Sequence, residues 1–152
     1  MKLELLMRYH ANLANSIAVG AGPFGNRLIV EVDGGEFEGP KLKGTFRNLS
    51  GADWLTLSED GYGHLDVRVT AETHDGAYIY VEYSGKLEMT EGVQKALAGE
   101  GETDYGDAYF ITSPRMQTGD PRYAWVNNIV CVAHGRLRPG RVEYEVFQVV
   151  ND

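Results

Sequence analysis

Two charged side chains in one strand-like segment are the leading candidates for chemistry. Apolar and polar residues alternate along His64–Glu72, so Asp66 and Arg68 project from one face if the segment is a β-strand. Facing a cavity, Arg68 would keep the Asp66 carboxyl ionised and able to accept a proton, and would stabilise a developing enolate or a substrate carboxylate. The alternative is a half-buried strand with its charges in solvent, which the alternation alone favours.

Aromatic and amide side chains are candidates for a binding pocket. Tyr123, Trp125 and Asn127 alternate along the chain and share one face of a strand if that segment is extended. Apolar rings with a few polar tips are typical of sites for ring-containing small molecules. The further substrate-binding candidates are Trp54, Tyr80 and Tyr109. Each of these residues taken singly is more often a packing residue than a ligand contact.

Other reaction chemistries lack their sequence context. Gly20–Gly25 has the G-x-G-x-x-G spacing, but a β-rich run follows it where a dinucleotide site needs a helix, so we expect a structural turn. The four histidines form no H-x-H or H-E-x-x-H pair, and His64-x-Asp66 is the nearest approach to a metal-binding unit. Cys131 lies in an apolar run without an activating base and is expected to be buried. We predict no cofactor and no metal.

The charge balance limits the partners. Fourteen Lys and Arg against 22 Asp and Glu give a net charge of −8, which disfavours nucleic acid and anionic membranes. Charges interrupt the segment Met1–Arg8 before an apolar signal core develops, and no run of apolar residues is long enough to span a bilayer. These features predict a cytoplasmic protein whose partner is a small molecule, and a homo-oligomer is compatible with them.

The elements that must position these residues are short strands. The 152 residues fit one domain, residues 1–152. Runs rich in β-branched and aromatic residues alternate with Asp-Gly and Pro-Gly turn signals, which is typical of antiparallel hairpins. The predicted strands are about eight, drawn from Leu3–Tyr9, Arg27–Val32, Glu36–Phe46, Trp54–Leu57, His64–Thr73, Ala77–Tyr83, Ala108–Ile111, Ile129–Leu137 and Val142–Val150. A hairpin turn is expected at Asp33-Gly34-Gly35.

The predicted fold class is all-β, an antiparallel closed β-barrel with one short helix. About eight strands close into a barrel of the lipocalin/calycin-like or allene-oxide-cyclase-like kind, with room for one small ligand, and a two-sheet sandwich is the competing arrangement. Thr90–Ala98 is the helical segment, with Thr90 as N-cap, closing one end of the barrel or lying over its side. The polar, glycine-rich Gly99–Asp107 is expected to be a mobile surface loop.

Several uncommon residue combinations follow one another along the chain. They are Gly25-Asn26-Arg27, Asp33-Gly34-Gly35, Glu38-Gly39-Pro40-Lys41-Leu42-Lys43-Gly44, Gly51-Ala52-Asp53-Trp54, Glu59-Asp60-Gly61, Leu65-Asp66-Val67-Arg68, Asp75-Gly76-Ala77-Tyr78-Ile79-Tyr80, Tyr109-Phe110, Pro114-Arg115-Met116-Gln117-Thr118-Gly119 and Tyr123-Ala124-Trp125-Val126-Asn127. In this order the chain resembles the domain-of-unknown-function family 3237, also called uncharacterised protein family 0311, over nearly its whole length.

The resemblance implies a small antiparallel β-barrel with a central cavity. It strengthens the pocket candidates Asp66, Arg68, Trp54, Tyr123, Trp125 and Asn127. It assigns no reaction, although members of the family sometimes accompany aromatic or polyketide metabolism. This chain has Ile111, Met116 and Gln117 where the family pattern favours Arg, Phe and Glu, at expected lumen or rim positions. We therefore expect a ligand that differs from that of close relatives.

Together these features predict a cofactor-independent enzyme of the isomerase, cyclase or lyase type that acts on a cyclic or aromatic, carbonyl-bearing metabolite. Asp66 would transfer the proton and Arg68 would stabilise the oxyanion or enolate. The alternatives are a carrier that uses the same cavity without chemistry, and a structural oligomerisation domain with a filled lumen. The orientation of His64–Glu72 distinguishes them, since inward Leu65, Val67 and Val69 leave an apolar carrier or a packed core.

Overall fold

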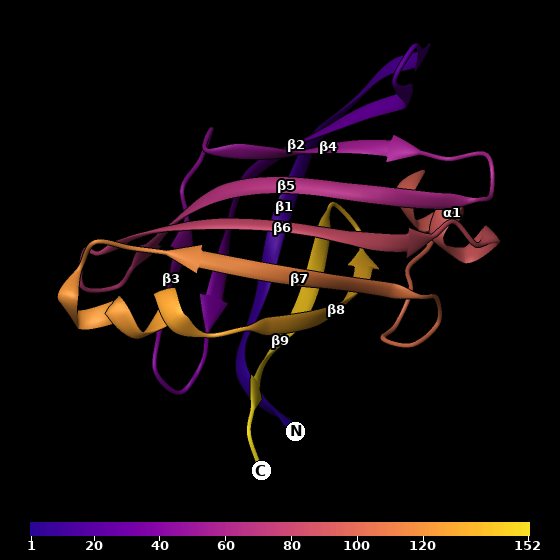
Figure 1. Ribbon diagram of the computed structural model, residues 1–152. Coiled ribbons are helices and arrows are strands. Elements are labelled where there is room, and N and C mark those ends of the chain that lie inside the picture. Colours follow the sequence, from indigo (N-terminus) through magenta and orange to yellow (C-terminus); the bar gives the residue numbers. More distant parts are fainter.

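Nine antiparallel strands form one closed ring in the computed structural model, which describes residues 1–152 (Figure 1). The strands are β1 (Lys2–Gly22), β2 (Gly25–Glu38), β3 (Lys43–Phe46), β4 (Gly51–Leu57), β5 (Tyr62–Thr73), β6 (Tyr78–Glu88), β7 (Phe110–Gln117), β8 (Cys131–Arg138) and β9 (Arg141–Val150). The order around the ring is β1-β9-β8-β7-β6-β5-β3-β2, and the β1–β2 pairing closes it. The predicted all-β barrel is confirmed.

Two short strands share one position in the ring. β3 pairs with the C-terminal part of β5, from Ala71 to Thr73, and β4 pairs with its N-terminal part, from Gly63 to Arg68. Both strands also pair with β2 on their other side. The nine strands therefore occupy eight positions, a ring size that leaves an interior wide enough for side chains and one small ligand.

The turn expected at Asp33-Gly34-Gly35 is absent, because β2 runs through these residues as one bent strand. Its first part pairs with β4 and its last part pairs with β3, so the bend moves β2 from one partner to the other. Gly34 has φ +81° and Gly35 has φ +142°, and a Cβ on Gly35 would lie 2.1 Å from the carbonyl oxygen of His10. Two consecutive glycines here produce a corner of the barrel instead of a hairpin.

Alternation of side chains fills the barrel with apolar groups. In β5 the buried apolar side chains are Leu65, Val67, Val69 and Ala71, and the residues between them point outward. The same alternation runs through β7 and β8, so the free thiol of Cys131 is buried as predicted. One contiguous apolar core results, and burial of its side chains provides the main driving force for folding.

Two helices accompany the barrel, and one of them was not predicted. α1 (Glu91–Leu97) begins after the expected N-cap, since the Thr90 hydroxyl accepts a hydrogen bond from the Val93 amide at 3.1 Å. η1 (Pro121–Asn128) is a 3₁₀ helix that follows β7. It contains Tyr123, Trp125 and Asn127, which were expected to lie on one face of a strand. Asp120 caps η1 and Pro121 stands in its first turn, two helix-start signals that the strand interpretation missed.

Candidate active site

One apolar cavity of about 150 Å³ lies inside the barrel. Its walls come from β1, β2, β4, β5, β6, β7, β8 and β9, and Leu97 of α1 lies at its edge. Of the sixteen lining residues only Ser16 and Asp53 are not hydrophobic, and none is a Lys, Arg or His. A cavity of roughly 150 Å³ with such walls accommodates a benzene-sized ring.

Asp53 of β4 faces this cavity. Its cross-strand partners are Val30 on β2 and Val67 on β5, both buried inside the barrel. Residues directly opposite each other in an antiparallel pair project to the same side of the sheet. The carboxylate therefore shares the lumen with the apolar side chains, although its neighbour Trp54 points outward.

The environment of Asp53 raises the pKa of its carboxyl group. Burial raises the pKa of the carboxyl from 3.8 to about 6, and the negative charge of Asp66 raises it further. Together they outweigh the opposing hydrogen bond from the Asp66 backbone amide and the attraction of the Arg27 guanidinium. The hydrogen bond from the Asp66 N–H to Asp53 Oδ1 is 3.0 Å long. A carboxyl with a pKa near 6 is mostly ionised at neutral pH and retains enough basicity to accept a proton.

Three tyrosines lie side by side within the same barrel. The ring centroids of Tyr9 and Tyr144 are 5.0 Å apart, and those of Tyr83 and Tyr144 are 5.5 Å apart. Tyr83 and Tyr144 line the cavity. Burial raises the pKa of Tyr83 to about 12 and raises the pKa of Tyr144 and Tyr9 well above 10. All three phenols therefore remain protonated hydrogen-bond donors at neutral pH, next to a carboxylate that is mostly ionised.

The position of Tyr144 depends on a glycine opposite it. Gly135 of β8 is the cross-strand partner of Tyr144 on β9. A Cβ on Gly135 would lie 2.7 Å from the Phe110 ring and 2.8 Å from the Tyr144 ring. The two rings therefore pack directly over the backbone at Gly135, and the glycine gives Tyr144 the space in which it reaches the lumen.

Asp66 and Arg68 do not face the lumen, which is the orientation that their expected catalytic role required. Both side chains project from the outer face of β5, with 53% and 47% of their side-chain surfaces exposed, and they form an ion pair with each other at 3.3 Å. The inward residues of His64–Glu72 are Leu65, Val67 and Val69, the orientation expected for an apolar carrier or a packed core, so this strand supplies no catalytic group. In high dielectric such a pair contributes little energy, and it has no contact with the cavity.

Three of the predicted pocket residues also lie on the outside. Trp54 lies under the Arg68 guanidinium, which is 5.2 Å from its ring centroid. Tyr80 is exposed and donates a 2.9 Å hydrogen bond to Glu82, and Tyr109 is exposed just before β7. The sheet thus gathers Trp54, Asp66, Arg68 and Tyr80 on its outer wall, away from the cavity.

The other three predicted pocket residues belong to η1 and stabilise the barrel end. The Tyr123 hydroxyl donates a 2.8 Å hydrogen bond to Asp75, and Trp125 packs against the core beneath Lys41. Asn127 exchanges hydrogen bonds of 2.8 and 3.0 Å with the backbone of Thr118. None of them lines the cavity. Of the departures from the family pattern, Met116 is buried, and Ile111 and Gln117 are exposed.

A serine–histidine pair on the outer surface has the wrong hydrogen-bond polarity for nucleophilic catalysis. His64 Nε2 lies 2.8 Å from Ser58 Oγ, and His64 Nδ1 lies 2.7 Å from Lys86 Nζ. An ammonium group only donates, so Nδ1 accepts from Lys86 and the ring proton resides on Nε2. His64 therefore donates to Ser58, whose own proton is directed to Asp60. The histidine has no lone pair with which to activate the serine.

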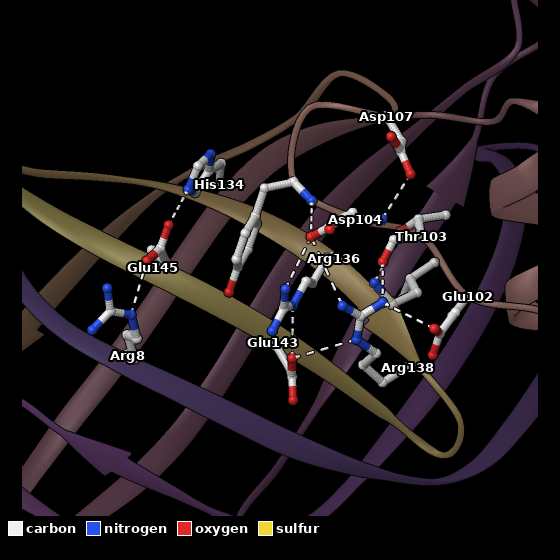
Figure 2. Close-up of polar contacts among 12 residues, drawn as sticks. Arg8, Glu102, Thr103, Asp104, Asp107, His134, Arg136, Arg138, Glu143 and Glu145 are labelled. Atoms are coloured by element: carbon white, nitrogen blue, oxygen red, sulfur yellow. Dashed lines mark hydrogen bonds and ion pairs between the residues drawn. The ribbon is translucent and has the colours of Figure 1, made fainter.

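The largest polar network also lies outside the lumen (Figure 2). Arg136 of β8 donates to Glu143 at 2.7 Å and to Asp104 at 2.9 Å, and its guanidinium lies 4.5 Å from the Tyr105 ring centroid. Arg138 donates to the Thr103 carbonyl at 2.7 Å. The network binds the segment that was expected to be a mobile loop, residues 99–107, to the wall of the barrel.

The structure contains no cluster of metal-ligating side chains and no helix that could span a membrane. No three His, Cys, Asp or Glu side chains are grouped so that they could hold a metal ion. Neither helix has the length and apolar character that crossing a membrane requires.

Sequence reasoning missed Asp53 and the tyrosine cluster, although a signal for them was present. Asp53 lies two residues before the buried Leu55, so the two side chains share the inner face of β4. Tyr83 lies on the inner face of β6 together with Ile79 and Val81. The polar residues that face the lumen thus share a strand face with apolar residues, whereas the predicted site residues share strand faces with other polar residues. A polar residue within the apolar phase of a strand is placed in the barrel interior by the period of two.

Comparison with solved structures supports the barrel. A β-barrel-like protein from Acinetobacter baumannii is 32% identical, with a TM-score of 0.82 over 97% of this chain and 94% of its own. A protein from Penicillium herquei described as an enzyme is 20% identical, with a TM-score of 0.71 over 98% of this chain and 94% of its own. At 20% identity, the similarity to the Penicillium herquei protein shows a shared fold and nothing more.

Comparison of sequences identifies the family. A protein of Rhodopseudomonas palustris named as a UPF0311 protein is 31% identical over 141 residues, which are 92% of this chain and 91% of that protein. The family model described as "Protein of unknown function (DUF3237)" matches residues 1–149. With nearly every residue inside that match, the chain is a member of the DUF3237 family.

Proposed function

We propose that the protein is a cofactor-independent enzyme of the isomerase, cyclase or lyase type, which performs acid/base chemistry on a small carbonyl-bearing ring compound in the barrel lumen. The observation that carries the proposal is Asp53, a carboxylate with a raised pKa that faces an apolar cavity beside phenol donors. Groups whose environments separate their pKa values in this way suit complementary acid and base roles.

The chemical step begins with the Asp53 carboxylate. It accepts a proton from a carbon next to the substrate carbonyl, which leaves a neutral carboxyl and an enolate. The Tyr83 and Tyr144 hydroxyls donate hydrogen bonds to the enolate oxygen and stabilise the charge that develops there. Return of the proton from Asp53 to a different carbon of the enolate system moves the double bond and completes an isomerisation, with no electron donor or acceptor required. In a cyclisation, the enolate carbon first adds to a second carbonyl carbon of the same substrate, the π bond of that carbonyl becomes an alkoxide, and Asp53 returns the proton to the alkoxide oxygen.

The lining of the cavity limits the substrate. A carboxylate or phosphate on the ligand would meet Asp53 with no cationic side chain to compensate, so we expect an uncharged compound. Polar contacts are available only near Asp53, Ser16 and the tyrosine hydroxyls, so most of the ligand is apolar. The size of the cavity favours one ring inside it, with any further part of the molecule at the opening.

Deuterium exchange tests the proposal without knowledge of the natural substrate. Phenylacetone is an uncharged, one-ring ketone, and solvent exchange of its α-protons in D₂O is followed by NMR. We expect the protein to accelerate the exchange above the buffer rate and Asp53→Asn to remove the acceleration. Glu82→Gln is the matched control, because it changes a carboxylate on the outer wall that pairs with Arg115, and it is expected to retain the acceleration.

The results of that experiment also separate the enzyme from the carrier. Chemical-shift changes at Tyr83 and Tyr144 on addition of phenylacetone, without accelerated exchange, would support a carrier and contradict the enzyme. Accelerated exchange that persists in Asp53→Asn would contradict the role of Asp53. The Penicillium herquei protein that shares the fold is described as an enzyme, which agrees with catalysis in such a barrel.

A further inference from the structure

The Tyr9 hydroxyl is a buried hydrogen-bond donor without an acceptor. Tyr9 lies on β1 inside the barrel, and its Oη atom has no hydrogen-bond partner. Packing does not require this hydroxyl, since the Tyr9 ring alone makes the contacts with the Phe46 and Tyr144 rings, at centroid distances of 5.1 and 5.0 Å. Buried polar groups in folded proteins are nearly all paired, so an orphaned hydroxyl in a packed interior requires another explanation.

Tyr9 meets Tyr83 across the interior of the barrel. β1 and β6 lie on opposite sides of the ring of strands, and the two tyrosine rings are 6.4 Å apart at their centroids and tilted by 51°. The Tyr9 hydroxyl lies near the Tyr83 hydroxyl without a well-formed hydrogen bond to it. Tyr83 lines the cavity and Tyr9 does not. Tyr9 therefore lies behind Tyr83 as seen from the cavity, with its hydroxyl directed to a group that faces the ligand.

The charge of Asp53 acts on the two tyrosines of the cavity. Burial is the main cause that raises the pKa of Tyr83 and of Tyr144, and the Asp53 carboxylate raises the pKa of both further. For Tyr9 the causes of the raised pKa are burial and the neighbouring Tyr83, and Asp53 is not among them. Tyr83 and Tyr144 are thus the phenols nearest the carboxylate, and Tyr9 follows behind them.

Hydrogen bonding couples the Tyr9 and Tyr83 hydroxyls. When a hydroxyl donates its proton to an anion, its own oxygen gains negative charge and becomes a better acceptor. A Tyr83 hydroxyl that donates to an anionic oxygen on the ligand therefore attracts the Tyr9 O–H more strongly than it does without that charge. A hydrogen bond that strengthens as negative charge develops stabilises an enolate more than the neutral ketone, as catalysis requires.

We propose that Tyr9 is a positioning residue of an oxyanion site, whose hydroxyl donates to the Tyr83 oxygen while the Tyr83 hydroxyl donates to an anionic oxygen on a bound ring compound. Tyr9 does not touch the ligand, and no covalent bond between the two tyrosines and the ligand forms or breaks. The ligand class is an enolate formed from a neutral ketone, and a phenolate mimics it. The inference rests on the proposed function, because it uses the same donor role of Tyr83. It also gives a role to a hydroxyl that packing does not require.

Binding of a phenolate tests the oxyanion site without catalysis. 4-Nitrophenolate is a one-ring oxyanion whose visible absorbance reports its ionisation and its binding. Asp53→Asn is the host protein, because the amide stands in for the protonated carboxyl that accompanies the enolate. We expect Asp53→Asn to bind 4-nitrophenolate, and Asp53→Asn/Tyr9→Phe to bind it about three- to tenfold more weakly. The affinity for 4-nitrotoluene, a neutral compound of similar shape, is expected to be equal in the two proteins.

Thr112→Val is the matched control. Thr112 is buried, its Oγ1 atom is the other side-chain polar atom of the interior without a hydrogen-bond partner, and it does not line the cavity. Valine keeps the shape of threonine, so this variant also loses an orphaned hydroxyl. We expect Asp53→Asn/Thr112→Val to bind 4-nitrophenolate as tightly as Asp53→Asn does.

Three results of the binding experiment would overturn the proposal. Failure of Asp53→Asn to bind 4-nitrophenolate would mean that the tyrosines form no oxyanion site. An affinity that is unchanged by Tyr9→Phe, or that falls equally with Thr112→Val, would remove the specific role of the Tyr9 hydroxyl. A parallel loss of affinity for 4-nitrotoluene would show that Tyr9 only shapes the cavity.

Catalysis provides a second readout. In the otherwise unchanged protein, Tyr9→Phe is expected to lower the maximal rate of phenylacetone exchange about three- to tenfold and to leave KM for the neutral ketone unchanged. A raised KM at an unchanged maximal rate would contradict the role of Tyr9. The two proposals fail separately: a wild-type protein that does not accelerate exchange contradicts the enzyme, whereas the binding of 4-nitrophenolate decides the role of Tyr9 by itself.

Discussion

The Asp53 carboxylate accepts a 3.0 Å hydrogen bond from the backbone N–H of Asp66, across the interface between β4 and β5. The ladder between these strands pairs Asp53 with Val67 and resumes only at Thr56 with His64. In the interrupted part, the Asp53 side chain provides the acceptor for an amide that the backbone ladder does not satisfy. The carboxylate that faces the lumen is thus held by the main chain of the residue that sequence reasoning had selected as the base.

Asp53 should make the protein less stable as pH rises. Its pKa is about 6 in the folded protein against 3.8 for the ordinary group, so the folded state binds more protons between these values. The free energy of unfolding therefore falls as pH rises from about 4 to about 6 because of this group, and then stays constant. Asn keeps an oxygen acceptor for the Asp66 amide without the buried charge. We expect Asp53→Asn to be more stable than wild type at pH 8 by about 1–3 kcal/mol.

Urea unfolding of both proteins at pH 4 and pH 8 measures this difference. At pH 4 we expect the two stabilities to converge, because Asp53 is then largely protonated in the folded protein. Carboxylates with lowered pKa values, such as Asp75 and Asp120, contribute to the free energy of unfolding with the opposite pH dependence. Their contributions are the same in variant and wild type, so they cancel in the difference between the two proteins. A difference that is the same at both pH values would show that Asp53 does not titrate as described.

The pH dependence of α-proton exchange should report the same group. If Asp53 is the base, exchange of phenylacetone per molecule of protein rises as pH passes through about 6 and then levels. The tyrosine hydroxyls stay protonated over this range, because the pKa of Tyr83 is about 12. A rate that is constant from pH 5 to 8, measured by NMR after subtraction of the buffer reaction, would contradict the assignment of Asp53.

Tyr9→Phe should stabilise the barrel. Tyr9 Oη is buried near the Tyr83 hydroxyl without a well-formed hydrogen bond to it, and the Tyr9 ring packs against Phe46 at a centroid distance of 5.1 Å. Removal of the hydroxyl relieves its desolvation cost and keeps the ring, so we expect a gain of about 1 kcal/mol in urea unfolding. Tyr123→Phe is the control: its hydroxyl donates to Asp75, and its loss should destabilise the protein by about 1–2 kcal/mol. A loss of stability in Tyr9→Phe would mean that the Tyr9 hydroxyl forms a hydrogen bond with the Tyr83 hydroxyl.

More of the fold than of the candidate site could be predicted from the sequence. Alternation and turn pairs predicted the barrel, because a strand such as β5 shows its buried face in its own residues. The bend at Gly34–Gly35 was misread, because a glycine pair permits both a turn and a barrel corner. Only the close approach of the His10 carbonyl, which comes from a distant segment, distinguishes the two.

The site depended on contacts that no local pattern records. The alternation along β5 shows only that Asp66 and Arg68 share one face of the strand. It does not show which face points inward. In the barrel the apolar face of β5 points inward, so Asp66 and Arg68 lie outside. Tyr123, Trp125 and Asn127 share no face because their segment is a 3₁₀ helix, in which residues two apart diverge. Asp53 acquires its raised pKa from burial by other strands, which only the closed ring produces.

Arg136→Gln should release residues 99–107 from the barrel wall. Arg136 joins Asp104 of this segment to Glu143 of β9, whose side chain is only 13% exposed (Figure 2). Loss of the guanidinium removes both ion pairs, and we expect faster chymotrypsin cleavage after Tyr105 with a loss of about 1 kcal/mol in stability. Arg115→Gln removes an exposed pair with Glu82 and should leave cleavage unchanged. Equal cleavage in all three proteins would show that the network does not hold the segment.

Gly135→Ala should disturb the lumen where Tyr144 enters it. The added Cβ would lie 2.7 Å from the Phe110 ring and 2.8 Å from the Tyr144 ring, so both rings must move within a packed interior. Such overpacking costs about 1–3 kcal/mol, measured by urea unfolding. Gly101→Ala is the matched control, since its Cβ meets nothing nearer than 3.9 Å. Because Tyr144 is one of the proposed donors to the enolate, Gly135→Ala should also slow phenylacetone exchange at pH 8 in protein that remains folded. If a folded but destabilised Gly135→Ala variant exchanges phenylacetone protons at the normal rate, Tyr144 does not contribute to catalysis and Tyr83 is the only donor to the enolate.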